Sequence, residues 1–256
     1  MKSIPGRTAA LYALAVLFAA SPSFTQEAQE IKLEALYKDL ADNNNYPVAQ
    51  GLKKATADVT CNVLQTVMSA FPEAAGAPVK VTYSWSRPSE NAWPEKKFEV
   101  TGIPANLADL TKRADMIFAE PISSFVIEDP VYWTIAQTQA SAKQEGTKIT
   151  VTGAGQQITD LKVDIDQATH QVQKIVMKVA NTEISFDMTR EKVGTRWGVK
   201  SLVMTNPQAT RLITYEYAEV NGFWLPKKIS LEYKGTTEPT FVYEFSNWRV
   251  ESQPVS

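Results

Sequence analysis

The amino-acid sequence predicts a mainly β protein, a curved antiparallel half-barrel of about eleven strands with a few helices covering the open concave side. The first observation is that apolar and polar residues alternate with a period of two through most of the chain, as in strands with one buried face. The second is the pair Asn221-Gly222 between two such runs, a strong hairpin signal because both residues tolerate positive φ. The third is a set of three segments with helical spacing of apolar residues.

Residues 1–23 are predicted to be a signal peptide. Lys2 and Arg7 precede an uncharged run from Thr8 to Ala20, and small residues follow it. The run is shorter than the roughly 20 apolar residues that a membrane span needs. An uncleaved anchor is the alternative. We therefore expect an exported, periplasmic protein with one domain over residues 24–256 and no integral membrane span after cleavage.

Charge and cysteine content narrow the classes of partner. Cleavage would leave 24 of the 26 basic residues against 28 acidic ones, so the mature chain is mildly acidic. This balance argues against a nucleic-acid or anionic-membrane partner bound by charge alone. Cys61 is the single cysteine, which excludes an internal disulfide, so the exported domain must be held together by packing.

Three helices are expected. Apolar residues between positions 31 and 40 form the first helical stripe. The second is predicted from Pro47, a favourable first helical residue, to Phe71, with apolar residues three or four apart and Pro72 as its stop. The third begins after Asn106, a suitable N-cap, and presents Leu110 and Phe118 on its apolar side.

The remaining segments alternate with a period of two and are joined by short turns, which predicts a meander of antiparallel strands. Residues 137–146 are expected to form a polar link. The predicted strands cover residues 79–85, 98–100, 133–135, 149–151, 161–165, 175–179, 184–188, 197–205, the two arms of the Asn221-Gly222 hairpin, and 241–250.

The width of such a sheet predicts its curvature. Eleven strands about 4.8 Å apart span roughly 50 Å, and three helices about 10 Å in diameter cover about half of the apolar face. The other face is polar along every strand, so a second sheet cannot stack on it. The sheet must therefore curl over its own apolar face, and the concavity is either filled by side chains or left as an apolar cavity.

We expect a hydrophobic ligand to contact the apolar residues of this concave side. The alternative is that these side chains only fill a core. The candidate lining consists of Tyr215, Tyr217, Trp224, Leu231, Tyr233, Tyr243 and Phe245 from the C-terminal strands, with Leu110 and Phe118 from the third helix.

The sequence offers no set of residues typical of an enzyme or a metal site. His170 is the single histidine and lies in a predicted turn. With one histidine and one cysteine, metal sites rich in these residues and a supported Cys-His pair are not expected. Asp164 and Asp166 share one polar strand face, where solvated carboxylates are the more common case. We therefore expect no catalytic residues, no metal and no cofactor.

The hairpin carries a resemblance to a known family. The run Tyr217-x-x-Val220-Asn221-Gly222-Phe223-Trp224-Leu225-Pro226-Lys227-Lys228-Ile229, together with the leader, the early helix and the meander, resembles the lipoprotein-carrier superfamily of LolA/LolB-like periplasmic proteins that sort outer-membrane lipoproteins. The resemblance implies a half-barrel whose concavity holds acyl chains. It also makes Arg211 one candidate for an arginine inside that cavity, with a surface position as the alternative.

These observations predict a binding function. The expected role is a carrier or chaperone that shields the acyl chain of a lipid or lipoprotein in the periplasm. The alternative is an envelope sensor or interaction module that contacts a protein partner and transports nothing.

Overall fold

The computed structural model describes residues 29–74, 76–87, 94–118, 122–127 and 138–253. Its helices are α1 (Leu33–Asn43), α2 (Asn62–Ser69) and α3 (Ala108–Phe118), with short 3-10 turns η1 (Pro72–Ala74) and η2 (Ile122–Phe125). Its strands are β1 (Gln29–Ile31), β2 (Leu52–Cys61), β3 (Lys80–Ser86), β4 (Glu95–Thr101), β5 (Gln139–Glu145), β6 (Lys148–Ala154), β7 (Ile158–Asp166), β8 (Gln171–Val179), β9 (Thr182–Val193), β10 (Arg196–Asn206), β11 (Ala209–Val220), β12 (Phe223–Tyr233) and β13 (Phe241–Ser252).

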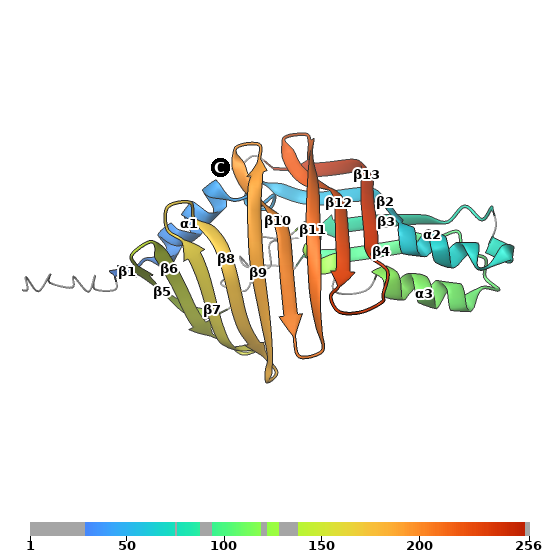
Figure 1. Ribbon diagram of the computed structural model, residues 1–256. Helices are drawn as coiled ribbons and strands as arrows, with labels where there is room; N and C mark the ends of the chain where they lie inside the picture. The colour runs from blue at the N-terminus through green and yellow to red at the C-terminus, as the bar shows by residue number, and fades with distance from the viewer. Residues whose placement is uncertain (1–28, 75, 88–93, 119–121, 128–137, 254–256) are drawn as a thin grey trace, which may run out of the picture.

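The described strands form one open antiparallel sheet of thirteen strands in the order β1-β5-β6-β7-β8-β9-β10-β11-β12-β13-β2-β3-β4 (Figure 1). Strands β5 to β13 follow one another as the predicted meander, and β2 to β4 continue the sheet beyond β13. The mainly β class is confirmed. The predicted signal peptide and the strand expected at residues 133–135 lie outside the described residues.

The hairpin of β11 and β12 has the predicted turn. Val220 pairs with Phe223, and Asn221 and Gly222 between them have φ of 49° and 85°. Both angles belong to a two-residue turn of the kind that matches the twist of paired strands. The register places Tyr215 opposite Ile229, so the apolar side chains of both arms lie on one face of the sheet.

The predicted helix from Pro47 to Phe71 is wrong in its first two thirds. Residues 52–61 are the strand β2, and only residues 62–69 form a helix, α2. Ala55, Ala57, Val59 and Cys61 alternate on the buried face of β2. These positions also satisfy part of a helical spacing, and pairing with β13 and β3, which come later in the chain, decides between the two structures.

The polar link predicted at residues 137–146 is also wrong, because it contains strand β5. Only Ala142 of β5 is buried, so the strand lacks the apolar alternation that identifies its neighbours. Residues 139–145 form a strand because their backbone pairs with β6 on one side and with β1 on the other. With β1, β2 and β5 added, the sheet has more strands than the sequence predicted.

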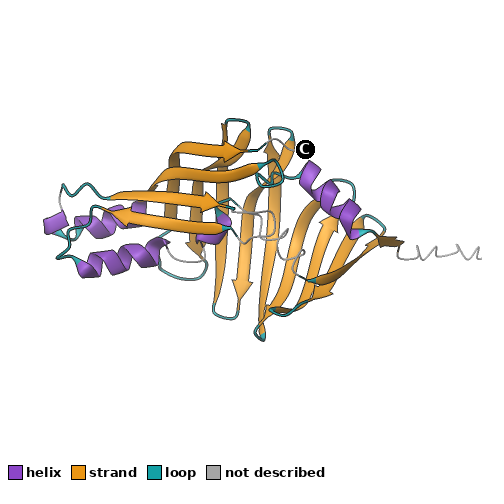
Figure 2. Cartoon of the chain, turned by 180° about the vertical axis from the view of Figure 1, so that it is seen from behind, coloured by secondary structure: helices purple, strands orange, loops and turns teal. Residues whose placement is uncertain are grey.

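Strand β13 is the corner at which the sheet bends. It pairs with β12 only over Phe241–Glu244 and then continues along β2. Between Ser246 and Arg249 the register shifts, and Asn247 takes a φ of 52°. A bulge of this kind bends and twists a strand. Strands β2 to β4 consequently cross behind β10 to β13, and the sheet curves over its apolar face as predicted (Figures 1 and 2).

The helices lie at the two ends of the concave face. α1 contacts β5 and β10 at one end, whereas α2 and α3 pack on each other and extend beyond the sheet at the other (Figures 1 and 2). α3 buries Leu110, Ala114, Ile117 and Phe118, the apolar side expected from the sequence. Within the part of the chain that is described, no helix has the length and apolar character to span a bilayer.

Candidate functional site

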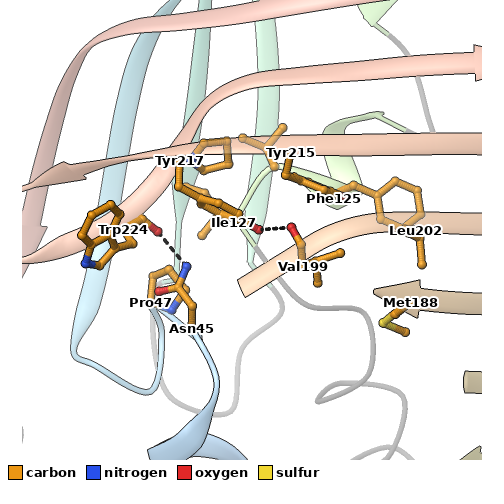
Figure 3. Close-up of a pocket in the computed structure, with 12 residues that line it drawn as sticks. Asn45, Pro47, Phe125, Ile127, Met188, Val199, Leu202, Tyr215, Tyr217 and Trp224 are labelled. Carbon is orange, nitrogen blue, oxygen red and sulfur yellow. Dashed lines mark hydrogen bonds between the residues drawn. The ribbon is translucent and has the colours of Figure 1, made fainter. Parts of the chain in front are cut away.

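A small cavity lies on the concave side between the sheet and the segment of residues 122–127, called the 122–127 segment below (Figure 3). The lining residues come from four strands, from that segment and from the loop after α1. They are Asn45, Pro47, Phe125, Val126, Ile127, Met188, Val199, Leu202, Tyr215, Tyr217, Trp224 and Pro226.

One wall of the cavity is the sheet. Met188 on β9 and Leu202 on β10 are directly paired, and Leu202 also pairs with Ile213 on β11. Tyr215 follows Ile213 by two residues, so alternation along β11 directs it to the same face. Tyr215 and Tyr217 stack with ring centroids 6.0 Å apart. The strand pattern therefore builds a continuous apolar and aromatic wall.

The opposite wall is the 122–127 segment. Ile122, Phe125, Val126 and Ile127 are all buried, with exposed fractions of 1–7%. The ring of Phe125 lies 6.4 Å from that of Phe186 on β9, measured between centroids. The segment thus covers the middle of the concave face with apolar side chains, in the gap that the helices leave.

The rim is held by hydrogen bonds from the loop after α1. Asn45 donates its backbone N–H to the carbonyl oxygen of Trp197, and its side-chain Nδ2 to the carbonyl oxygen of Trp224, each at 2.9 Å. The Trp224 indole lies against Gly194, where a Cβ would come within 2.5 Å of Nε1. The Trp224 ring is therefore engaged at the rim, and in Figure 3 it points away from the cavity centre.

The cavity is small and mainly apolar. Its volume is about 40 Å³, room for roughly three water molecules at about 10–15 Å³ each. The Tyr217 hydroxyl, a polar group at its edge, donates to the carbonyl oxygen of Val199 at 3.1 Å. Among the described residues, the lining carries no acidic or basic side chain and no cysteine, serine or histidine. This arrangement can hold an apolar group.

The structure divides the predicted ligand-binding residues among three places. Tyr215, Tyr217 and Trp224 line the cavity. Leu231, Tyr243, Phe245, Leu110 and Phe118 are at most 5% exposed and belong to the packed interior. There Phe118 meets the ring of Tyr243 with centroids 5.8 Å apart, and the Tyr243 hydroxyl donates to the carbonyl oxygen of Ile117 at 2.8 Å. Burial raises the pKa of Tyr243 well above its ordinary range, which keeps the hydroxyl protonated.

Arg211 and Tyr233, the remaining predicted ligand-binding residues, lie in a third region of the structure. They pair across β11 and β12, and the guanidinium carbon of Arg211 lies 5.2 Å from the centre of the Tyr233 ring. This pair lies near the start of β11, at the end of the hairpin opposite the Asn221-Gly222 turn. Both residues are partly buried.

Sequence reasoning missed half of the cavity wall. Met188 and Leu202 belong to strands whose alternation was recognised, so their inward direction was available from the pattern. The 122–127 segment has no helical or strand period that would have identified Phe125, Val126 and Ile127 as lining. Their role depends on where the segment lies in the fold.

Comparison with known proteins gives one structural neighbour and no sequence relative. No protein-family model matches the chain, and no curated protein matches it. A crystal structure of a LolA superfamily protein from Nitrosomonas europaea aligns with a TM-score of 0.32 and 8% identity, covering 88% of this chain and 96% of the other. The neighbour belongs to the superfamily that the Asn221-Gly222 hairpin resembles. At this TM-score we transfer no ligand and no residue role from it.

Proposed function

We propose that the protein binds the acyl chain of a lipid or lipoprotein on the concave face of its sheet and acts as a carrier or chaperone. The observation that carries the proposal is the cavity between two apolar walls, the sheet on one side and the 122–127 segment on the other. At the edge of the cavity, the side-chain amide of Asn45 and the hydroxyl of Tyr217 each donate a hydrogen bond to a backbone carbonyl oxygen. An apolar chain is the ligand that such a lining favours.

The cavity volume implies that the 122–127 segment competes with the ligand. About 40 Å³ accommodates the end of a chain and not its whole length. A longer chain needs the space beside Leu202 and Tyr215 that Phe125 and Ile127 occupy. Binding therefore exchanges the apolar side chains of the segment for the methylene groups of the ligand.

The free energy available from burial is sufficient for useful affinity. Each buried methylene group contributes about 0.8 kcal/mol, so about ten of them give roughly 8 kcal/mol, the equivalent of micromolar binding. Ordering the chain and displacing the 122–127 segment subtract from this value. A weak, exchangeable complex suits a carrier, which must release what it binds.

We also propose that the protein works in the periplasm and is not an enzyme. The first point rests on the basic, apolar and small-residue pattern of residues 1–23. The second rests on the described part of the cavity lining, which holds no carboxylate, lysine, histidine, serine or cysteine. A binding role requires no acid, base or nucleophile.

Filling the cavity tests the proposal. Val199→Phe adds a ring to the lining, whereas Lys200→Phe adds the same ring to the next, exposed residue. In a titration with a fluorescent twelve-carbon acyl probe, we expect the parent and Lys200→Phe to bind at micromolar concentration and Val199→Phe to bind about tenfold more weakly. A parent protein that binds no probe, or equal affinity in all three proteins, would refute the proposed site.

A further inference from the structure

Arg211 is a cation on the apolar side of the sheet. Its cross-strand neighbours are Met204 on β10 and Tyr233 on β12. The residue is partly buried, and its Nε atom is fully enclosed without a hydrogen-bond partner among the described residues. Since a buried polar group without a partner costs free energy, this position calls for an explanation.

The surrounding carboxylates do not neutralise Arg211. None of the ion pairs found between described side chains includes it. Glu232, adjacent to Tyr233 in the chain, lies on the other face of β12, where it accepts a hydrogen bond from Lys234 at 2.8 Å. The guanidinium instead lies over the Tyr233 ring, 5.2 Å from its centre. Stacking on a ring leaves the edge of the planar guanidinium able to donate to a bidentate anion.

Arg211 is aligned with the cavity along one strand. Arg211, Ile213 and Tyr215 alternate on the same face of β11, and Tyr215 lines the cavity. Four residues of a strand span about 13 Å. An extended chain of about ten methylene groups has the same length, given carbon–carbon bonds of about 1.5 Å. A cation and an apolar cavity are thus separated by the length of a medium acyl chain.

We propose that Arg211 binds the anionic head group, a carboxylate or phosphate, of an amphiphile whose acyl chain runs along β11 into the cavity. This inference rests on the proposed function and names the class of ligand, a singly or multiply negative amphiphile in place of a neutral lipid. The guanidinium donates to the head group, and the chain lies over Ile213, the residue between Arg211 and Tyr215 on this face. Arg211 is then the residue that determines head-group specificity.

The test compares two ligands with the same chain. Dodecanoate and 1-dodecanol both have twelve carbons and differ in head-group charge, and each is titrated against a bound fluorescent acyl probe. We expect the parent to prefer dodecanoate by about tenfold, with a preference that shrinks at high salt. Arg211→Leu should lose the preference and keep its affinity for dodecanol, while Arg211→Lys should retain part of the preference.

A matched control removes the same charge from elsewhere on the sheet. Arg249 is an exposed residue of β13, and Arg249→Leu should preserve the preference for dodecanoate. Inorganic phosphate at millimolar concentration should fail to displace dodecanoate. Displacement would show a site for free anions and overturn the assignment to an amphiphile.

The outcomes separate this inference from the proposed function. If the parent binds both ligands equally, or if Arg211→Leu keeps the preference in a protein with an unchanged melting curve, the head-group assignment is wrong and the acyl-binding function stands. If the parent binds neither ligand, both are wrong.

Discussion

Replacing Phe125 with alanine should strengthen ligand binding while it destabilises the free protein. Phe125 is 7% exposed, packs near Phe186 and belongs to the segment that occupies the concave face. Truncating a buried phenylalanine to alanine typically costs about 3–5 kcal/mol. Because Phe125 already borders a cavity, we expect a value of about 3 kcal/mol, at the lower end of that range.

The direction of the binding change follows from competition. If a ligand must displace the 122–127 segment, its apparent affinity is reduced by the fraction of molecules in which the face is free. Each 1.4 kcal/mol by which the segment is weakened then raises the affinity about tenfold. If the whole loss of about 3 kcal/mol came from weaker docking of the 122–127 segment, the ligand affinity would rise by roughly a hundredfold, which is the upper bound.

The assay is a titration with the fluorescent twelve-carbon probe beside a thermal melt of each variant. Phe245→Ala is the matched control, since Phe245 is 5% exposed but packs against Tyr83 and Trp248, among residues that do not line the cavity. It should lower the melting temperature without raising the affinity. Unchanged or weaker binding by Phe125→Ala would show that the segment is a fixed wall of the site and refute the competition.

The remaining predictions concern the second end of the site, the turn, acid stability and export. Tyr233→Ala should weaken acyl binding by removing the ring beside Arg211, whereas Glu232→Ala on the polar face should leave the titration unchanged; equal loss in both would contradict this. Gly222→Val should lower the free energy of unfolding by about 1–3 kcal/mol, because φ is 85° there, and an unchanged denaturant midpoint would count against the turn. Hydrogen bonds from the hydroxyl and N–H of Thr169 lower the pKa of Asp166, so its stabilising contribution is present above about pH 4 and is lost as the pH falls further; Asp166→Asn should flatten the acid limb of the stability curve. N-terminal sequencing of the exported protein should begin between Ala20 and Thr25, and recovery of Met1 would exclude cleavage.

The parts of the fold that could be predicted are those determined by local sequence. The Asn221-Gly222 turn requires positive φ at both residues, and the structure has it. α3 follows from one apolar side that ends in Ile117 and Phe118. In both cases the residues that determine the element are within a few positions of one another.

The parts that failed depend on distant pairing. β2 contains small residues, Ala55 and Ala57, that fit helix and strand patterns alike, and its neighbours β13 and β3 are needed to make it a strand. β5 is polar because it lies near an edge of the sheet and buries only Ala142. No local pattern distinguishes such segments from helices or links.

The candidate site shows the same division. The alternation of β11 correctly directs Tyr215 and Tyr217 to the concave side, where they line the cavity. The same reasoning could not separate them from Tyr243 and Phe245, which share the face but are covered by packing in the interior. Tyr243 is covered by Phe118 of α3, and Phe245 packs against Tyr83 and Trp248; the positions of these neighbours relative to the sheet are a tertiary property.

Photocrosslinking with an acyl chain tests the central claim most directly. A dodecanoic acid that carries a diazirine at the far end of its chain is bound, irradiated and located by peptide mass spectrometry. The account predicts saturable labelling, one chain per protein, on cavity residues such as Met188, Leu202 and Tyr217. Label that does not saturate, or that falls on the polar face of the sheet or on α2 and α3, would contradict it.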